Sequence, residues 1–90
     1  MGDALRHCAD LKSVFRRHAG GWLDRESLRR VTDLCTRTAE CAQDPHARFE
    51  IGRVAFYAEL LHSHRGPRID LLRERILISL ESVESLLYRG

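Results

Sequence analysis

The chain has little proline, little glycine, no long apolar run and a single lysine. Two prolines and six glycines among 90 residues are too few for a collagen-like chain, a flexible linker or a turn-rich β-sandwich. No apolar stretch approaches the roughly 20 residues that a membrane-spanning helix needs. The residues after Met1 show no basic segment followed by an apolar one, so no secretory signal is expected. These absences predict a soluble, cytoplasmic protein without membrane contact.

Size and composition indicate one globular domain over residues 1–90. Hydrophobic residues make up 43% and charged residues 31% of the chain, a balance typical of folded proteins. A chain of this length forms one small core and not two. The net charge of +2 creates no strong field toward nucleic acid or anionic lipid. Acidic residues are interspersed among the many arginines, as expected for a solvated surface.

Three breaks divide the chain into four helical segments, and no strict alternation of apolar and polar residues marks a strand. Gly20–Gly21 ends the first segment, because glycine tolerates the left-handed conformation at a helix C-terminus. Asp24 caps the second segment, and Asp44–Pro45 begins the third. Gly66–Pro67 precedes the fourth. The sequence predicts helices over 3–19, 24–43, 45–64 and 67–88, with Asp3 as the first N-cap.

The predicted helices differ in how many apolar faces they show at 100° per residue. The first two have one apolar stripe each, and these stripes include all the cysteines: Cys8, Cys35 and Cys41. The third has two opposed apolar faces, one with Ala47, Ile51, Val54, Ala58 and Leu61 and the other with Phe49, Phe56 and Leu60. In the fourth, Leu71 and Ile78 lie opposite the main stripe. A helix with two apolar faces needs to be covered from two directions.

Short connections between helices of similar length favour antiparallel neighbours. The expected fold class is therefore all-α, a small four-helix bundle with up-down-like order. The junction at Asp44–Pro45 is so short that the second and third helices could instead cross at an angle. Surplus apolar residues on the third helix predict completion of the bundle by homodimerisation. The alternative is that the bundle itself covers this helix on both sides.

The chain shows no signature of catalysis. It has no glycine-rich phosphate loop, no nucleophile elbow and no His-Glu-x-x-His, so we expect neither an enzyme nor a cofactor. His18, His62 and His64 fall in the last turns of predicted helices, where cations are favoured, and a metal there would lack a third ligand. The cysteines are expected to be buried core thiols, and no metal site is predicted. Trp22 is expected to cover one end of the bundle.

The pattern favours a non-enzymatic protein-interaction module, such as an adaptor, a chaperone-like protein or a regulatory subunit, acting through apolar helix faces. Its partner would be a second copy or another helical protein, since aromatic anchors are typical of such surfaces. The predicted contact residues are Phe49, Phe56, Leu60, Leu71 and Ile78. The alternative is a small dimeric DNA-binding or metal-responsive regulator. Its turn would lie at residues 20–23, and its phosphate contacts would be Arg25, Arg29, Arg30 and Arg37.

Overall fold

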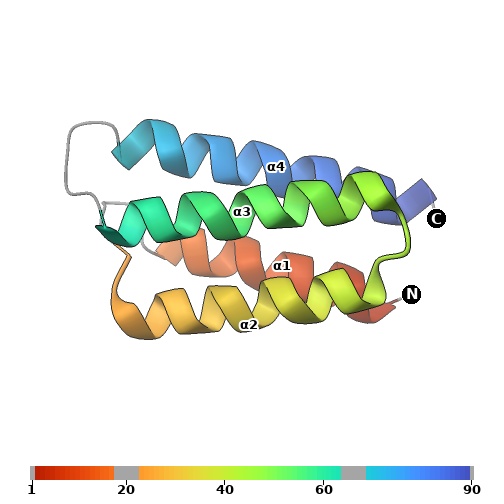
Figure 1. Cartoon of the computed structure of the whole chain (residues 1–90). Helices are drawn as coiled ribbons and strands as arrows, with labels where there is room; N and C mark the ends of the chain where they lie inside the picture. Colours follow the sequence, from red (N-terminus) through yellow and green to blue (C-terminus); the bar gives the residue numbers. More distant parts are fainter. Residues whose placement is uncertain (1, 18–22, 64–68, 90) are drawn as a thin grey trace.

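Four helices run alternately up and down in a computed structural model of the chain, which describes residues 2–17, 23–63 and 69–89. They are α1 (Gly2–Arg17), α2 (Arg25–Cys41), α3 (Pro45–Ser63) and α4 (Ile69–Arg89). Each is antiparallel to the next, and α1 begins at the end of the bundle where α4 finishes (Figure 1). These residues form no strand. The prediction of an all-α, four-helix fold is therefore confirmed.

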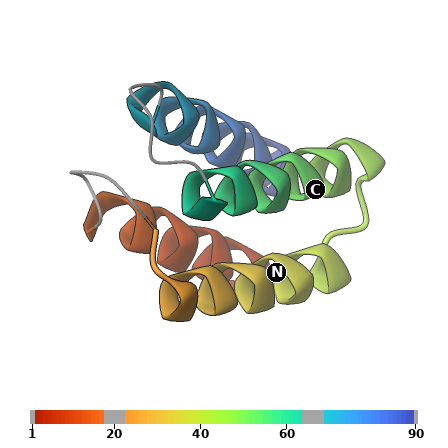
Figure 2. The same ribbon diagram turned by 60° about the vertical axis from the view of Figure 1, so that its left-hand side comes forward.

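The helices form a ring in which each one packs against two others. α1 contacts α2 and α4, and α3 likewise contacts α2 and α4. The turned view in Figure 2 shows the pair α3 and α4 lying over the pair α1 and α2. Each helix therefore turns one side toward the centre of the ring and leaves the opposite side outside.

A single hydrophobic core fills the centre of the ring. Its buried members come from all four helices and from the segments next to α2: Cys8, Leu11, Val14, Phe15, Leu23, Val31, Leu34, Cys35, Ala42, Ala47, Ile51, Val54, Ala58, Leu61, Ile76, Leu80 and Val83. Thr38 is also buried, and its hydroxyl donates to the Leu34 carbonyl at 2.6 Å. This bond satisfies the only strongly polar atom of that side chain, so Thr38 fits an otherwise apolar stripe.

Two of the three predicted N-caps are confirmed. Oδ1 of Asp24 accepts from the Ser27 N–H at 2.7 Å, and Oδ1 of Asp44 accepts from the His46 N–H at 2.8 Å. The prediction for Asp3 was wrong, because α1 already begins at Gly2 and Asp3 lies inside its first turn. There the carboxylate still interacts favourably with the helix dipole. The breaks predicted at residues 20–21 and 66–67 lie outside the described residues.

The chain reverses direction between α2 and α3 over the short segment 42–44. Ala42 leaves the helix in an extended conformation (φ −87°, ψ 126°), while its N–H still donates to the Thr38 carbonyl. The Arg48 Nε then donates to the Ala42 carbonyl at 2.8 Å, which ties the start of α3 to the end of α2. α2 and α3 consequently lie antiparallel (Figure 1), and the angled crossing considered from the sequence does not occur.

Candidate interaction surface on α3 and α4

Large apolar side chains are exposed on the outer side of α3 and α4. Phe49 and Phe56 on α3 are 65% and 62% exposed, and Leu71 and Ile78 on α4 are 57% and 58% exposed. These four residues form what we term the outer apolar face. Tyr88, near the end of α4, is also exposed. Of the five predicted contact residues, four are thus accessible to a partner, while Leu60 is half-buried.

Helix periodicity explains why these side chains point outward. Phe49 and Phe56 are seven residues apart, which is close to two turns, and so share one side of α3. Ala47, Ile51, Val54, Ala58 and Leu61 are buried on the other side. Leu71 and Ile78 have the same spacing on α4, opposite Ile76, Leu80 and Val83, which are buried. The two apolar faces predicted for the third helix are both present, and the chain itself covers one of them.

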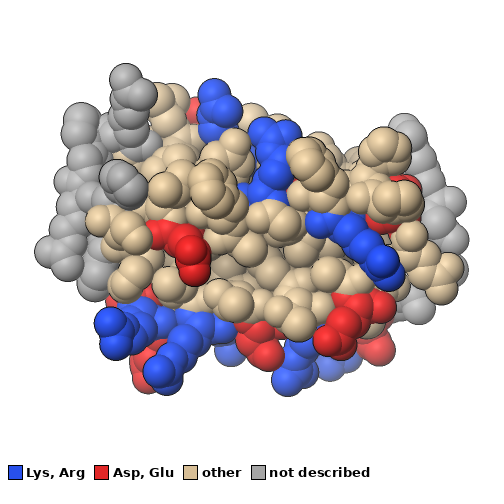
Figure 3. All heavy atoms as spheres, viewed as in Figure 1, with Lys and Arg blue, Asp and Glu red and all other residues tan. Residues whose placement is uncertain are grey.

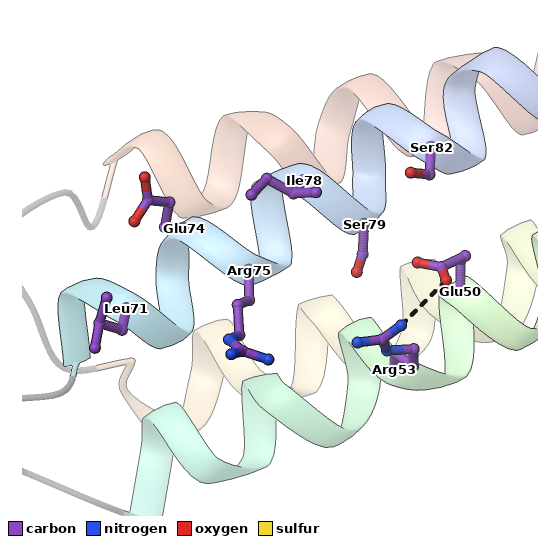
Figure 4. Close-up of a pocket in the computed structure, with 8 residues that line it drawn as sticks. All are labelled: Glu50, Arg53, Leu71, Glu74, Arg75, Ile78, Ser79 and Ser82. Atoms are coloured by element: carbon purple, nitrogen blue, oxygen red, sulfur yellow. Dashed lines mark hydrogen bonds and ion pairs between the residues drawn. The ribbon is translucent and has the colours of Figure 1, made fainter.

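A groove separates α3 from α4 on this outer side. Its lining comes from both helices: Glu50, Arg53, Leu71, Glu74, Arg75, Ile78, Ser79 and Ser82. Figure 4 shows Arg75 pointing from α4 toward α3, and Arg53 lying beside Glu50 on the α3 side. Phe49 and Leu86 border the continuation of the groove at one end, and Tyr57 and Leu72 border it at the other. The surface therefore combines apolar side chains with a polar centre.

Arg53 is the most highly connected side chain in this polar centre. Its Nη1 lies 3.4 Å from Oε1 of Glu50, and its Nη2 donates to the Tyr57 hydroxyl at 3.3 Å. The guanidinium carbon lies 5.9 Å from the centre of the Phe49 ring and 5.8 Å from that of Tyr57, within the range of cation–π attraction. Contacts with Glu50, Phe49 and Tyr57 thus hold this long side chain across the surface.

Two arginines converge on the Tyr57 hydroxyl. Hydrogen bonds from Arg53 and from Arg75 lower the pKa of Tyr57, because both favour the phenolate form. The bond to Tyr57 is also the main reason that the pKa of Arg53 is raised. Sequence reasoning missed this cluster. Arg53 and Tyr57 are four residues apart, so their contact on one helix could have been predicted from the sequence. The position of Arg75 beside them could not, because it depends on how α4 packs against α3.

The arginines considered for nucleic acid lie on the outer side of α2. All four are exposed: Arg25, Arg29, Arg30 and Arg37. Acidic side chains share that side, and Arg37 Nε lies 3.0 Å from Oδ2 of Asp33. Figure 3 shows red and blue atoms mixed along the lower edge, over α2. α1 and α2 are antiparallel neighbours (Figure 1), whereas the two helices of a DNA-binding helix-turn-helix cross at about 90–120°.

Two of the three cysteines are buried thiols. Burial raises the pKa of Cys8 to about 11 and that of Cys35 to about 12, because an apolar surrounding disfavours the charged thiolate. The prediction for Cys41 was wrong, since Cys41 is exposed. α2 ends at this residue, and the chain turns so that Ala42 is buried instead.

The histidines that the structure describes show no arrangement that would bind a metal ion. Within 2–17, 23–63 and 69–89, no three histidine, cysteine or acidic side chains are grouped closely enough to hold one. Nδ1 of His62 lies 2.8 Å from the Leu23 carbonyl oxygen, so this ring links the end of α3 to the start of α2. His46 is exposed in the first turn of α3. His18, His64 and Trp22 lie outside the described part of the chain.

No protein-family model, curated protein or solved structure matches this chain. In the parts of the chain described by the structure, no helix has the length and apolar character needed to cross a bilayer.

Proposed function

We propose that this protein is a non-enzymatic interaction module that binds another protein through α3 and α4. The observation that carries the proposal is the outer apolar face, on which Phe49, Phe56, Leu71 and Ile78 are each more than half exposed. Covering these four side chains would contribute roughly 4–7 kcal/mol before the costs of association. A stable complex therefore also needs contacts in the groove between the two helices.

The polar centre of the surface suits such contacts. Aromatic residues and arginine carry much of the binding energy in protein interfaces, and Phe49, Arg53 and Tyr57 lie together on α3. Arg53 is already held by Glu50 and Tyr57. A side chain ordered before binding loses less conformational entropy when a partner arrives. The cluster is therefore a favourable anchor within the apolar surroundings.

The outer side of α2 has a different character, which supports the choice of α3 and α4. Most of its exposed side chains are charged residues of both signs, with Thr32 and Thr36 among them, and Arg37 and Asp33 already form a pair with each other. Such a surface is well solvated, so covering it with a partner would contribute little binding free energy. The antiparallel packing of α1 and α2 and this mixed charge give the DNA-binding alternative less support.

Photo-crosslinking in cells tests the proposal. A benzoylphenylalanine is placed at Phe49 or at Phe56 in the full-length chain, and at the exposed Arg30 on α2 as the matched control. We expect the two α3 positions to give one discrete adduct of the same mass, and Arg30 to give none. Introducing Ile78→Asp on α4 should abolish that adduct, because it places a charge in the same surface without changing the crosslinker.

Two results would contradict the proposal. One is the absence of any discrete adduct from Phe49 and Phe56 in a chain that remains folded and abundant. The other is an adduct that Arg30 gives equally well and that Ile78→Asp leaves unchanged, since the crosslinking would then not depend on α3 and α4.

A further inference from the structure

We propose that the groove between α3 and α4 recognises an acidic side chain of the partner protein, which Arg53 and Arg75 bind together beside the Tyr57 hydroxyl. The proposed ligand is the carboxylate of an Asp or a Glu that has apolar residues on both sides of it in one partner segment. This inference rests on the proposed function, namely that the α3 and α4 surface binds a protein. It adds the chemistry of the partner segment and the residues that select it.

Arg53 and Arg75 come from different helices and meet at one oxygen atom. Both line the groove, and the Arg53 Nη2 donates to the Tyr57 hydroxyl at 3.3 Å. Arg75 borders one end of the groove together with Tyr57, and its side chain points from α4 toward α3 (Figure 4). It donates to the same hydroxyl. The Tyr57 oxygen thus marks a position that two guanidinium groups reach at once.

Both guanidinium groups have hydrogen-bonding capacity left for a ligand. A guanidinium carries several N–H donors in one plane, and Arg75 is exposed. The contacts of Arg53 with Glu50 and Tyr57 measure 3.4 Å and 3.3 Å, longer than the distance of about 2.7–2.9 Å typical of a strong charge-assisted bond. A phenol oxygen is also a weaker acceptor than a carboxylate, which can accept two N–H groups of one guanidinium in parallel. A carboxylate beside the hydroxyl would therefore give both arginines a stronger acceptor.

The charges around the groove favour a ligand with a single negative charge. Glu50 compensates Arg53, since its Oε1 lies 3.4 Å from the Arg53 Nη1. No carboxylate among the described residues forms an ion pair with Arg75, and the Glu74 side chain, which also lines the groove, is turned away from Arg75 in Figure 4. A carboxylate would neutralise the positive charge that remains on Arg75. A phosphate, with a charge close to −2, would exceed that charge and be repelled by Glu50.

Apolar side chains border the groove on both sides of the two arginines. Tyr57 and Leu72 border one end, and Phe49 and Leu86 border the other. Leu72 and Leu86 are 14 residues apart on α4, which corresponds to about 21 Å of helix. Because the groove continues past the arginines in both directions, it suits a carboxylate within a segment better than one at a chain end. The partner segment should therefore have apolar residues before and after its acidic residue.

Peptide selection on the purified full-length chain tests the inference. The probe is a displayed library of random peptides about 15 residues long, which is enough to span the groove. We expect the enriched peptides to contain an Asp or a Glu between apolar residues. Replacing that residue with Asn or Gln in a synthetic peptide should weaken its binding to the wild type by about tenfold or more, measured by fluorescence anisotropy. Arg75→Gln should bind the acidic peptide and its amide counterpart almost equally, because Glu50 already compensates the remaining Arg53.

Arg29→Gln is the matched control, since Arg29 is an exposed arginine on α2, outside this groove. It should leave both affinities unchanged, and the circular dichroism of both variants should match that of the wild type. The inference is overturned if no peptide is enriched, if the enriched peptides bind the wild type equally well with an amide in place of the acid, or if Arg75→Gln leaves the preference for the acid intact. Tighter binding of a phosphoserine at the acidic position would also overturn it, because the site would then be one for phosphate.

Photo-crosslinking from Phe49 in cells distinguishes a failure of this inference from a failure of the proposed function. Arg75→Gln should reduce the yield of the discrete adduct, whereas Arg29→Gln should not. An adduct that forms in full yield with Arg75→Gln would show that the surface binds a protein without using the arginines, so that only the inference is refuted. If the chain with all its arginines gives no adduct, the proposed function fails together with the inference.

Discussion

Lys12 and Glu84 join the first helix to the last, with the Lys12 Nζ donating to Oε1 of Glu84 at 2.9 Å. The two side chains are only 14% and 32% exposed. The pair joins α1 to α4, which are neighbours in the ring of helices. No loop connects these two helices directly, so their packing depends on contacts between side chains. Partial burial makes the loss of one partner of this ion pair more costly than the loss of one partner of a pair on the open surface.

Removing one partner of this pair should destabilise the bundle. We expect Lys12→Ala to lower the free energy of unfolding by about 1–3 kcal/mol, because the half-buried Glu84 is then left without its cation. Arg37→Ala is the matched control, since its pair with Asp33 is 60% and 59% exposed and should contribute about 0.5 kcal/mol or less. Urea unfolding measures both values. Equal losses in the two variants would show that the Lys12–Glu84 pair has no special role.

Cys41 should be the reactive thiol of the folded chain. It is exposed at the end of α2, whereas Cys8 and Cys35 are buried and have raised pKa values. We expect one thiol per chain to react promptly with Ellman's reagent, and the other two to react only after unfolding. Cys41→Ser should abolish the prompt reaction. A prompt reaction that survives this substitution would mean that one of the buried thiols is accessible.

The buried thiols should make the bundle less stable in alkali. Their pKa values rise from 9.0 to about 11 for Cys8 and to about 12 for Cys35. Above pH 9 the unfolded chain loses these protons while the folded chain keeps them, so stability is complete below pH 9 and falls as the pH rises toward 11 or 12. The free energy of unfolding between pH 8 and pH 11, measured in urea, should fall less steeply in Cys35→Ala than in the wild type. Cys41→Ala should leave the slope unchanged. Equal slopes in the wild type, Cys35→Ala and Cys41→Ala would show that the buried Cys35 thiol does not cause the loss of stability in alkali.

The Tyr57 hydroxyl should ionise at a lower pH than its ordinary pKa of 10.0, because Arg53 and Arg75 donate to it. Ultraviolet absorbance follows the ionisation, and Tyr57→Phe identifies the contribution of this residue beside that of Tyr88, the other tyrosine. We expect Arg75→Gln to move the Tyr57 transition to higher pH. If the transition stays in place in both Arg75→Gln and Arg53→Gln, neither guanidinium reaches the hydroxyl in solution.

Local patterns in the sequence were sufficient to predict the four helices and the two apolar faces of α3. Asp24 and Asp44 cap their helices as predicted, because capping depends only on the next few residues. The seven-residue spacing of Phe49 and Phe56 likewise fixed their common side, since every residue of a helix turns through the same angle. These features needed no knowledge of which helix lies beside which.

Features that depend on contacts between helices were not predictable in this way. Cys41 is the exposed last residue of α2, which ends two residues earlier than predicted. The Arg48 contact with the Ala42 carbonyl that accompanies this ending comes from α3. Arg75 reaches Tyr57 only because α4 packs beside α3 in one register. The Lys12–Glu84 pair joins residues 72 apart in the chain. In each case the deciding partner lies on another helix.

The native mass of the complex formed in cells tests the role of α3 and α4 most directly. Light scattering on the complex isolated from an extract should give a mass well above the 10.4 kDa of one chain. We expect Phe56→Asp to reduce that mass to a single chain while the circular dichroism of the purified variant stays helical, and Arg29→Asp on α2 to leave the complex intact. A folded Phe56→Asp chain that still sediments and scatters at the wild-type mass would contradict the proposal that the outer apolar face binds the partner.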